Sequence, residues 1–252
     1  MNLTGKNVVV TGGSRGLGLG MVEALVARGA RVTAIARDGA ALEVAGARLG
    51  VATICADVTD ETAAHRILAE VRPDILVLNA GTPPRMARLD KVNWADFTAP
   101  WETDVKAGLY WLQAVLNLPL APGSRVLVVS SGAAQHGSPM SGGYGGAKRM
   151  LWFMAEYADT ISKQKDLGVR FQTIVPQQMI GGTGVGDAGA NAYARALGVT
   201  PEAFLTRFGA PMTPRDFGEK VASVLDDPKY LGGSAFGLKG DTGITMLQEA
   251  TA

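Results

Sequence analysis

Short runs of β-branched and aliphatic residues alternate with longer stretches of helical periodicity from one end of the chain to the other. The short runs predict strands, and several are apolar at consecutive positions, as are strands of a parallel sheet covered on both faces. The longer stretches carry apolar residues three and four positions apart, which predicts helices. The expected strands are 7–11, 31–35, 51–56, 74–78, 125–130, 169–175 and 234–238, and the expected helices are 17–28, 40–49, 61–71, 103–116, 144–163 and 214–225.

Regular alternation of strand and helix predicts one α/β domain over residues 1–252, doubly wound and of Rossmann type. We expect a parallel sheet of about seven strands with helices on both faces. Residues 177–213 interrupt the rhythm, are rich in Gly and Ala, and contain a short helix predicted to start at Thr200-Pro201. Connections of this length inside a domain are usually functional, so we interpret the segment as a lid over a substrate site.

Composition excludes several classes of protein. The 252 residues carry 24 Lys and Arg against 23 Asp and Glu, a net charge of +1 that argues against a nucleic-acid-binding protein. The single cysteine, Cys55, rules out an internal disulfide and is predicted to be buried in the third strand. Neither histidine has a second ligand nearby in the sequence, so no metal site is predicted. The apolar runs are too short for a membrane span, and no signal segment is recognisable, so a cytoplasmic location is expected.

Glycine is over-represented, with 33 residues, and a first cluster follows the first strand as Thr11-Gly12-Gly13-Ser14-Arg15-Gly16-Leu17-Gly18. A chain that turns tightly from a strand into a helix needs residues without a Cβ atom. Such a loop lets backbone amides and the helix dipole hold a pyrophosphate. Two further glycine clusters, in 132–146 and 181–189, are interpreted as room for substrate and as mobility of the lid.

Four motifs in order resemble the short-chain dehydrogenase/reductase family: TGxxxGxG at Gly12, Gly16 and Gly18, then Asp57-Val58, then Asn79-Ala80-Gly81, then Ser131 followed thirteen residues later by Tyr144-Gly-Gly-Ala-Lys148. Each motif lies at the carboxyl end of an expected strand or at the start of the next helix. The resemblance covers residues 5 to about 180. It implies a nicotinamide-dependent oxidoreductase with Asp57 and Val58 near the adenine, and with Pro176 and Met179 near the nicotinamide. The family usually has Pro-Gly where this chain has Pro176-Gln177, so residues 177–183 are placed less securely.

The resemblance also implies the catalytic groups. Reduction of a carbonyl needs a proton donor, and a tyrosine hydroxyl with an ordinary pKa near 10 needs an adjacent cation to act near neutral pH. Tyr144 and Lys148 are four residues apart on an expected helix and hence on one face. We therefore expect Lys148 to lower the pKa of Tyr144, and the resemblance implies that it also holds the nicotinamide ribose. Ser131 is expected to polarise the carbonyl, and Ser130 to pack within the strand.

One position departs from the family pattern. Many members carry an asparagine on the fourth helix that feeds a proton relay, and matching 103–113 to that helix places Asp104 there. Two interpretations stay open. Either Asp104 serves the relay and pairs with Lys148, or the relay is altered or absent and Asp104 is an ordinary acid at a helix start.

The second strand suggests which cofactor is used. In folds that bind NAD, an acidic residue at its end holds the ribose 2′-hydroxyl. Here Ala36 occupies that position, Arg37 follows, and Arg15 lies in the glycine loop. Two guanidinium groups suit a 2′-phosphate, which favours NADP(H) over NAD(H). Alternatively, both arginines are solvated residues at helix starts.

Substrate and assembly are less sharply indicated. The expected lid supplies Met179, Tyr193, Leu197, Phe204, Phe208 and Met212, which either line a site for a medium-sized hydrophobic ketone, aldehyde or secondary alcohol or form a small core of their own. The family resemblance implies a homodimer or homotetramer that pairs helices 103–116 and 144–163. Two rival functions remain: an NAD-dependent alcohol dehydrogenase, and a catalytically silent NADP(H)-binding regulator.

Overall fold

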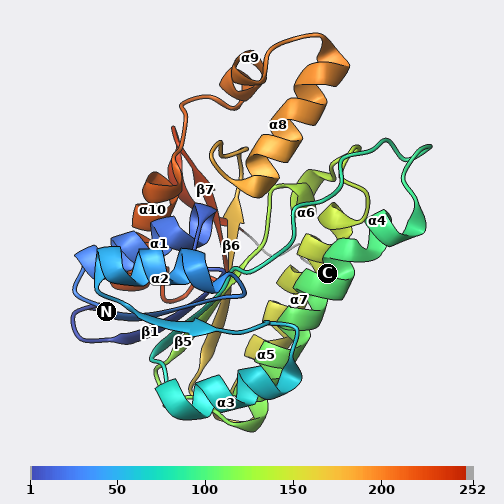
Figure 1. Ribbon diagram of the computed structural model, residues 1–252. Helices are drawn as coiled ribbons and strands as arrows, with labels where there is room; N and C mark the ends of the chain where they lie inside the picture. Colours follow the sequence, from blue (N-terminus) through green and yellow to red (C-terminus); the bar gives the residue numbers. More distant parts are fainter. Residues whose placement is uncertain (1, 248–252) are drawn as a thin grey trace.

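The computed structural model describes residues 2–247 and has the doubly wound architecture that the alternation predicted (Figure 1). The sheet runs in the order β3-β2-β1-β4-β5-β6-β7-β8, and the strand order reverses between β1 and β4. The strands are β1 (Asn7–Thr11), β2 (Arg31–Ala36), β3 (Ala52–Cys55), β4 (Ile75–Leu78), β5 (Arg125–Val129), β6 (Arg170–Pro176), β7 (Ala235–Lys239) and β8 (Gly243–Leu247). All seven expected strands are confirmed as parallel neighbours, and an eighth, β8, adds to β7 in antiparallel orientation.

Helices cover both faces of the sheet. They are α1 (Gly16–Ala27), α2 (Gly39–Leu49), α3 (Glu61–Val71), α4 (Trp94–Pro100), α5 (Lys106–Asn117), α6 (Ala133–His136), α7 (Tyr144–Gln164), α8 (Gly184–Leu197), α9 (Pro201–Leu205) and α10 (Pro214–Asp226). In Figure 1, α1, α2 and α10 lie on one side of the sheet, and α3, α5 and α7 on the other. Because side chains alternate along a strand, Val8 and Val10 of β1 pack in the core beneath α1 and α10, and Val9 packs in the core beneath α3, α5 and α7.

The third strand corrects one expectation. Cys55 is exposed, because β3 is an edge strand whose side chains are mostly accessible. Its thiol donates a hydrogen bond to the carbonyl oxygen of Arg37 at 3.4 Å.

Helices α1 and α10 pack so closely that their backbones touch. A Cβ atom on Gly218 would overlap the carbonyl oxygen of Gly20, and one on Gly20 would overlap the carbonyl oxygen of Pro214. Both glycines are buried. This contact fixes α10, which begins directly after the expected lid, against the helix that follows the glycine loop.

The segment 177–213 is more regular than its composition suggested. The helix predicted to start at Thr200-Pro201 is present as α9, with Thr200 capping it and Pro201 in its first turn. Helix α8, which the sequence did not predict, precedes it. Its glycines have a packing reason, since a Cβ atom on Gly186 would overlap the carbonyl oxygen of Ile180 and one on Gly189 would lie 2.9 Å from Cε of Met179.

Within residues 2–247, no helix combines the length and the apolar character that crossing a membrane requires.

Candidate active site

The glycine loop joins β1 to α1 with a backbone that only glycine adopts readily. Gly12 and Gly16 have φ values of +69° and +54°, in the left-handed region. A Cβ atom on Gly18 would overlap the carbonyl oxygen of Gly12. The side chain of Arg15 at the N-cap of α1 forms no capping hydrogen bond, in contrast to Asp38 at the start of α2. The first turn of α1 therefore presents backbone N–H groups that fit an anionic pyrophosphate.

The segment after β4 is fastened to this loop. The Asn79 side chain donates to the carbonyl oxygen of Thr11 at 3.0 Å. The Thr11 hydroxyl accepts from the backbone N–H groups of Asn79 and Ala80 at 2.9 and 3.1 Å, and donates to the carbonyl oxygen of Val77 at 3.2 Å. These hydrogen bonds join the end of β1 to the segment after β4, so Thr11 and Asn79 hold the two strand ends side by side although they are 68 positions apart in the sequence.

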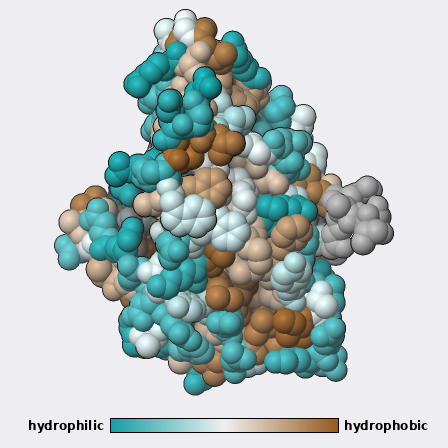
Figure 2. Space-filling model, turned by 90° about the vertical axis from the view of Figure 1, so that its right-hand side faces the viewer, coloured by the Kyte–Doolittle hydropathy of each residue, from teal (hydrophilic) through white to brown (hydrophobic). Residues whose placement is uncertain are grey.

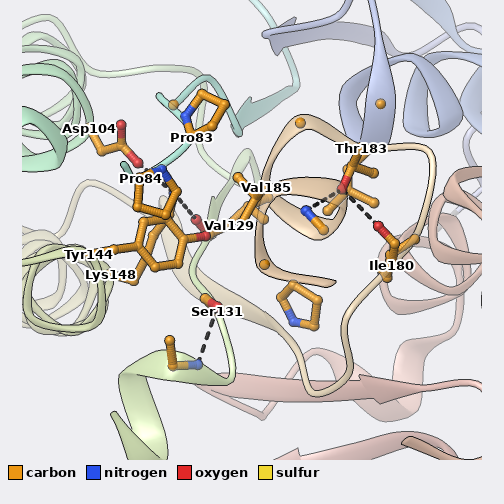
Figure 3. A pocket seen from close by; sticks show the side chains of 18 of the residues that line it. Pro83, Pro84, Asp104, Val129, Ser131, Tyr144, Lys148, Ile180, Thr183 and Val185 are labelled. Atoms are coloured by element: carbon orange, nitrogen blue, oxygen red, sulfur yellow. Dashed lines mark hydrogen bonds and ion pairs between the residues drawn. The ribbon is translucent and has the colours of Figure 1, made fainter. Parts of the chain in front are cut away.

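Tyr144, Lys148 and Ser131 come together where β5 ends and α7 begins (Figure 3). Tyr144 is 6% exposed and Lys148 is 5% exposed. The Ser131 hydroxyl accepts from the N–H of Ala133 at 3.2 Å, which orients it at the strand end. Ser130 is buried and donates to the carbonyl oxygen of Lys148 at 2.7 Å, so it ties β5 to α7.

Asp104 lies against this group and is not an ordinary acid at a helix start. It sits in a π-helical turn (Trp101–Val105) that joins α4 to α5 without a break. Its carboxylate is fully buried, with Oδ2 2.9 Å from Nζ of Lys148 and Oδ1 accepting the N–H of Thr82 at 2.8 Å. Trp101 of the same turn donates to the carbonyl oxygen of Gly143, directly before α7, at 3.2 Å. The π turn therefore contacts the start of α7 twice.

Lys148 lowers the pKa of Tyr144, as expected, but other effects in the free site outweigh it. Burial raises the pKa of Tyr144, the Asp104 carboxylate raises it further, and Lys148 and a hydrogen bond from Ser131 only partly oppose this. The net pKa of Tyr144 is raised. Burial lowers the pKa of Lys148, but Asp104 and Tyr144 outweigh burial and raise it overall. Lys148 is thus a cation whose charge is largely compensated by Asp104.

A cavity of about 930 Å³ connects the glycine loop to this group. Nearly all of the predicted cofactor and catalytic residues line it, namely Gly12, Ser14, Arg15, Gly16, Leu17, Gly18, Arg37, Val58, Asn79, Ala80, Gly81, Asp104, Ser131, Tyr144, Lys148, Pro176 and Met179. Asp57 is the exception. Its carboxylate accepts from the N–H and hydroxyl of Thr59 at 2.9 and 2.8 Å, which lowers its pKa, and it lies 3.7 Å from Arg37.

The two arginines lie at the far end of the cavity from Tyr144. Arg15 is exposed, and the Arg37 side chain is 65% exposed with Nη1 facing Asp57. Asp38, the acid next to Arg37 in the sequence, accepts a hydrogen bond from the N–H of Ala41 at 3.1 Å. The last residue of β2 is Ala36, so no carboxylate stands at that position.

The substrate side of the cavity contains residues that sequence reasoning missed. Pro83, Pro84 and Val185 of α8 line it, and Pro84 is drawn next to Tyr144 in Figure 3. The signal for the two prolines was a Pro-Pro pair one residue after the third motif, and Val185 carried none. Of the expected apolar lid residues, Met179, Tyr193, Phe204 and Phe208 line the cavity. Two expectations are wrong: Leu197 is 50% exposed at the end of α8, and Met212 is buried in the main core beside α10.

Both apolar interpretations of the lid hold in part. Tyr193 and Phe204 stack with ring centroids 5.6 Å apart, and Phe208 meets Phe204 edge-on at 5.5 Å, so the residues form a small core as well as a cavity wall. The hydroxyl of Tyr193 lies 2.9 Å from that of Ser138, which also lines the cavity.

The departure at Gln177 is accommodated by side-chain hydrogen bonds. Gln177 donates to Oε1 of Gln135 at 3.0 Å. Gln178 is buried, donates to the carbonyl oxygen of Ala210 at 3.0 Å and accepts from the N–H of Gly240 at 2.5 Å. The chain after β6 is therefore anchored at both glutamines.

The described part of the chain contains no group of three or more His, Cys, Asp or Glu side chains able to hold a metal ion.

Comparison with known proteins agrees with this geometry. The model of the family described as short chain dehydrogenase matches residues 6–186. The short chain dehydrogenase/reductase AacuD of Aspergillus aculeatus is 36% identical over 171 residues, covering 62% of this chain and 60% of that protein. The chain spans less than two thirds of the length of the first such relatives.

Two solved structures share the fold. A short chain dehydrogenase from Burkholderia cenocepacia J2315 in complex with NADP superposes with a TM-score of 0.78 at 24% identity, covering 96% of this chain and 99% of the other. An NAD⁺-bound xylitol dehydrogenase superposes with a TM-score of 0.80 at 21% identity, covering 94% and 98%.

Proposed function

Because the chain belongs to the short chain dehydrogenase family and is thus an oxidoreductase, we propose that it transfers hydride between NADP(H) and a carbonyl compound, reducing a ketone or aldehyde to an alcohol in a reversible reaction. One observation carries the proposal. Tyr144, Lys148 and Ser131 lie together at one end of a cavity whose other end is the glycine loop.

The cavity fits a nicotinamide dinucleotide. Gly12, Gly16 and Gly18 leave the space that side chains would fill, and the uncapped start of α1 supplies backbone donors for the pyrophosphate. When bound, the cofactor supplies or accepts the hydride. Val58, Asn79, Ala80 and Gly81 form the wall beyond the loop, and Pro176 and Met179 the wall nearest the substrate.

The chain's own residues handle the proton. The Tyr144 hydroxyl donates its proton to the carbonyl oxygen as negative charge develops there, and Ser131 donates a hydrogen bond to the same oxygen. Lys148 stabilises the tyrosinate that remains and would hold the cofactor ribose when the cofactor is bound. Solvent then returns the proton to Tyr144. In alcohol oxidation the same proton moves in the opposite direction.

The substrate proposal follows from the lining of the cavity. Pro83, Pro84, Met179, Val185 and Phe204 make it largely apolar. The polar side chains Gln135 and Gln177 bond to one another, and Ser138 bonds to Tyr193. We infer a medium-sized hydrophobic ketone, aldehyde or secondary alcohol as the substrate class.

A panel of ketones and aldehydes with NADPH, and of secondary alcohols with NADP⁺, followed by NADPH absorbance, tests the function. Turnover of hydrophobic members supports it. Turnover with NAD(H) alone identifies the NAD-dependent alcohol dehydrogenase instead. Tight NADPH binding with no turnover across the panel identifies the catalytically silent regulator.

Cofactor preference is tested at the two arginines. We expect Arg15→Ala and Arg37→Ala, each made singly, to weaken NADPH binding about 5- to 150-fold while leaving NADH binding nearly unchanged, because each charged hydrogen bond to a 2′-phosphate contributes about 1–3 kcal/mol. Fluorescence titration with both cofactors measures this. Arg48→Ala, whose guanidinium pairs with Glu23 at 2.6 Å, is the control. Tighter binding of NADH than NADPH to the unmodified protein would refute the preference.

Assembly as a homodimer or homotetramer is proposed through the face over α4, α5 and α7. Figure 2 shows apolar side chains gathered among hydrophilic ones on this side of the molecule. Trp101, Leu109 and Tyr157 are exposed there at 38%, 42% and 55%. Light scattering should give a mass of at least two chains, and a monomer would contradict the proposal. The cytoplasmic location stays a prediction.

A further inference from the structure

The buried pair between Asp104 and Lys148 is an unusual feature of the site. Lys148 is the cation expected to favour a tyrosinate at Tyr144, yet a carboxylate with no exposed surface lies 2.9 Å from its Nζ (Figure 3). The amine also donates a hydrogen bond to the carbonyl oxygen of Val129 at 3.5 Å. In a site shielded from water, a charge so close cancels much of the field that Lys148 exerts on its neighbours.

We propose that Asp104 neutralises Lys148 and thereby keeps Tyr144 as a neutral phenol, which makes the site a proton donor to carbonyl oxygens over a wide pH range and an acceptor of alcohol protons only in alkaline solution. This inference rests on the proposed function, because it assigns Tyr144 the proton transfer. It makes Asp104 a positioning residue that acts through Lys148. It also distinguishes the two directions of the reaction by the protonation state that each requires.

The groups around Tyr144 leave few other sources of charge. Within residues 2–247, the charged side chains that act on its hydroxyl are Lys148, one turn further along α7, and Asp104, from the π turn packed against α7. From β5, Ser131 contributes a neutral hydroxyl. Asp104 and Tyr144 are likewise the groups that act on Lys148. Burial favours the neutral phenol, and removing the charge of Asp104 would leave the Lys148 cation unopposed beside Tyr144.

The chain is built to admit this carboxylate. A Cβ atom on Gly81 would lie 2.6 Å from Oδ2 of Asp104, so only glycine leaves room for it. Oδ1 is held by the N–H of Thr82, which fixes the side chain between the segment after β4 and α7. The carboxylate is thus held from both sides, and Lys148 has no other acid within ion-pair distance among the described residues.

The proton balance gives the consequence. Reduction adds a hydride to the carbonyl carbon and the Tyr144 proton to its oxygen, leaving a tyrosinate that solvent reprotonates. It proceeds as long as Tyr144 starts as a phenol. Oxidation takes the alcohol proton onto a tyrosinate, so the fraction of protein able to begin it falls tenfold for each pH unit below the pKa of Tyr144.

Asp104→Asn is the decisive variant, because the amide oxygen can still accept from Thr82 while the negative charge is removed. We measure tyrosinate absorbance against pH for this variant and the unmodified protein, each after subtraction of its Tyr144→Phe counterpart. The midpoint for Tyr144 is expected to fall by about one pH unit or more, since a cation at this distance shifts a neighbour by about 1–3 units. An unchanged or higher midpoint overturns the proposal.

Asp159→Asn is the matched control. Asp159 is also a buried acid of an ion pair, with Lys163 at 2.7 Å and Arg170 at 3.1 Å, but it lies at the other end of α7. It should leave the Tyr144 midpoint unchanged. If Asp104→Asn does not fold, Asp104→Ser removes the same charge with a smaller side chain and is judged by the same criterion.

The pH dependence of turnover is the second readout. With a ketone substrate, the alkaline decline in rate should begin at lower pH in Asp104→Asn. With an alcohol substrate, activity should extend to lower pH by the same interval. If no substrate is turned over, the proposed function fails while the absorbance titration still decides this inference.

Discussion

Replacing Tyr144 with phenylalanine is expected to reduce turnover about a thousand-fold, within the 10²- to 10⁴-fold range for loss of a positioned proton donor. The ring is 6% exposed and packed over Lys148, whose Nζ lies 5.6 Å from the ring centroid, so phenylalanine keeps the volume and removes only the hydroxyl. NADPH affinity should change little. Steady-state rates and fluorescence titration measure the two quantities separately.

Tyr157→Phe provides the control, because Tyr157 lies on the same helix and is 55% exposed. Its turnover should match that of the unmodified protein. Retention of substantial turnover in Tyr144→Phe would refute the assignment of Tyr144 as the proton donor. Loss of both turnover and cofactor binding would instead indicate a structural role.

Gly218→Ala should destabilise the protein by about 3 kcal/mol, the upper part of the range for overpacking a closely packed contact. The added methyl group would overlap the backbone of Gly20, which cannot rotate away as a side chain could. Alanine favours a helix over glycine by about 1 kcal/mol, so any observed loss understates the steric term. Chemical denaturation followed by circular dichroism measures the free energy of unfolding.

Gly146→Ala is the matched change in an open position. A Cβ atom there would meet only a ring carbon of Trp101 at 3.5 Å, an ordinary contact. It should be neutral or slightly stabilising. Equal effects of the two substitutions would show that the approach of α1 and α10 does not limit stability.

The features that the sequence predicted correctly are those determined by the local pattern of residues. Apolar runs identified the seven parallel strands, and the motifs placed Tyr144 and Lys148 on one helical turn. Strand β8 was missed because its side chains are half exposed at the sheet edge and carry no apolar run. Helix α4 contains Pro100, and α8 is rich in Gly and Ala, so neither shows a strong apolar stripe.

The features that the sequence could not predict depend on contacts between segments far apart in the chain. Whether Asp104 was a helix-start acid or a partner of Lys148 could not be decided from residues 103–113, because the answer lies in α7 and in the N–H of Thr82. Burial of Tyr144, together with the Asp104 carboxylate, raises the pKa of Tyr144 overall, and neither effect could be derived from the local sequence. The glycines of 181–189 were interpreted as a sign of mobility, whereas for Gly186 and Gly189 contacts with Ile180 and Met179 give a reason in packing.

The π-helical turn has a consequence for how this position can evolve. An α-helix advances about 100° per residue, so deleting one residue within Trp101–Val105 would turn every preceding side chain by that angle relative to α5. Trp101 could then no longer meet Gly143 while α5 kept its packing. A single-codon deletion or insertion here would re-register the helix and present a different side chain to Lys148, a change that no one substitution in the surrounding core could make.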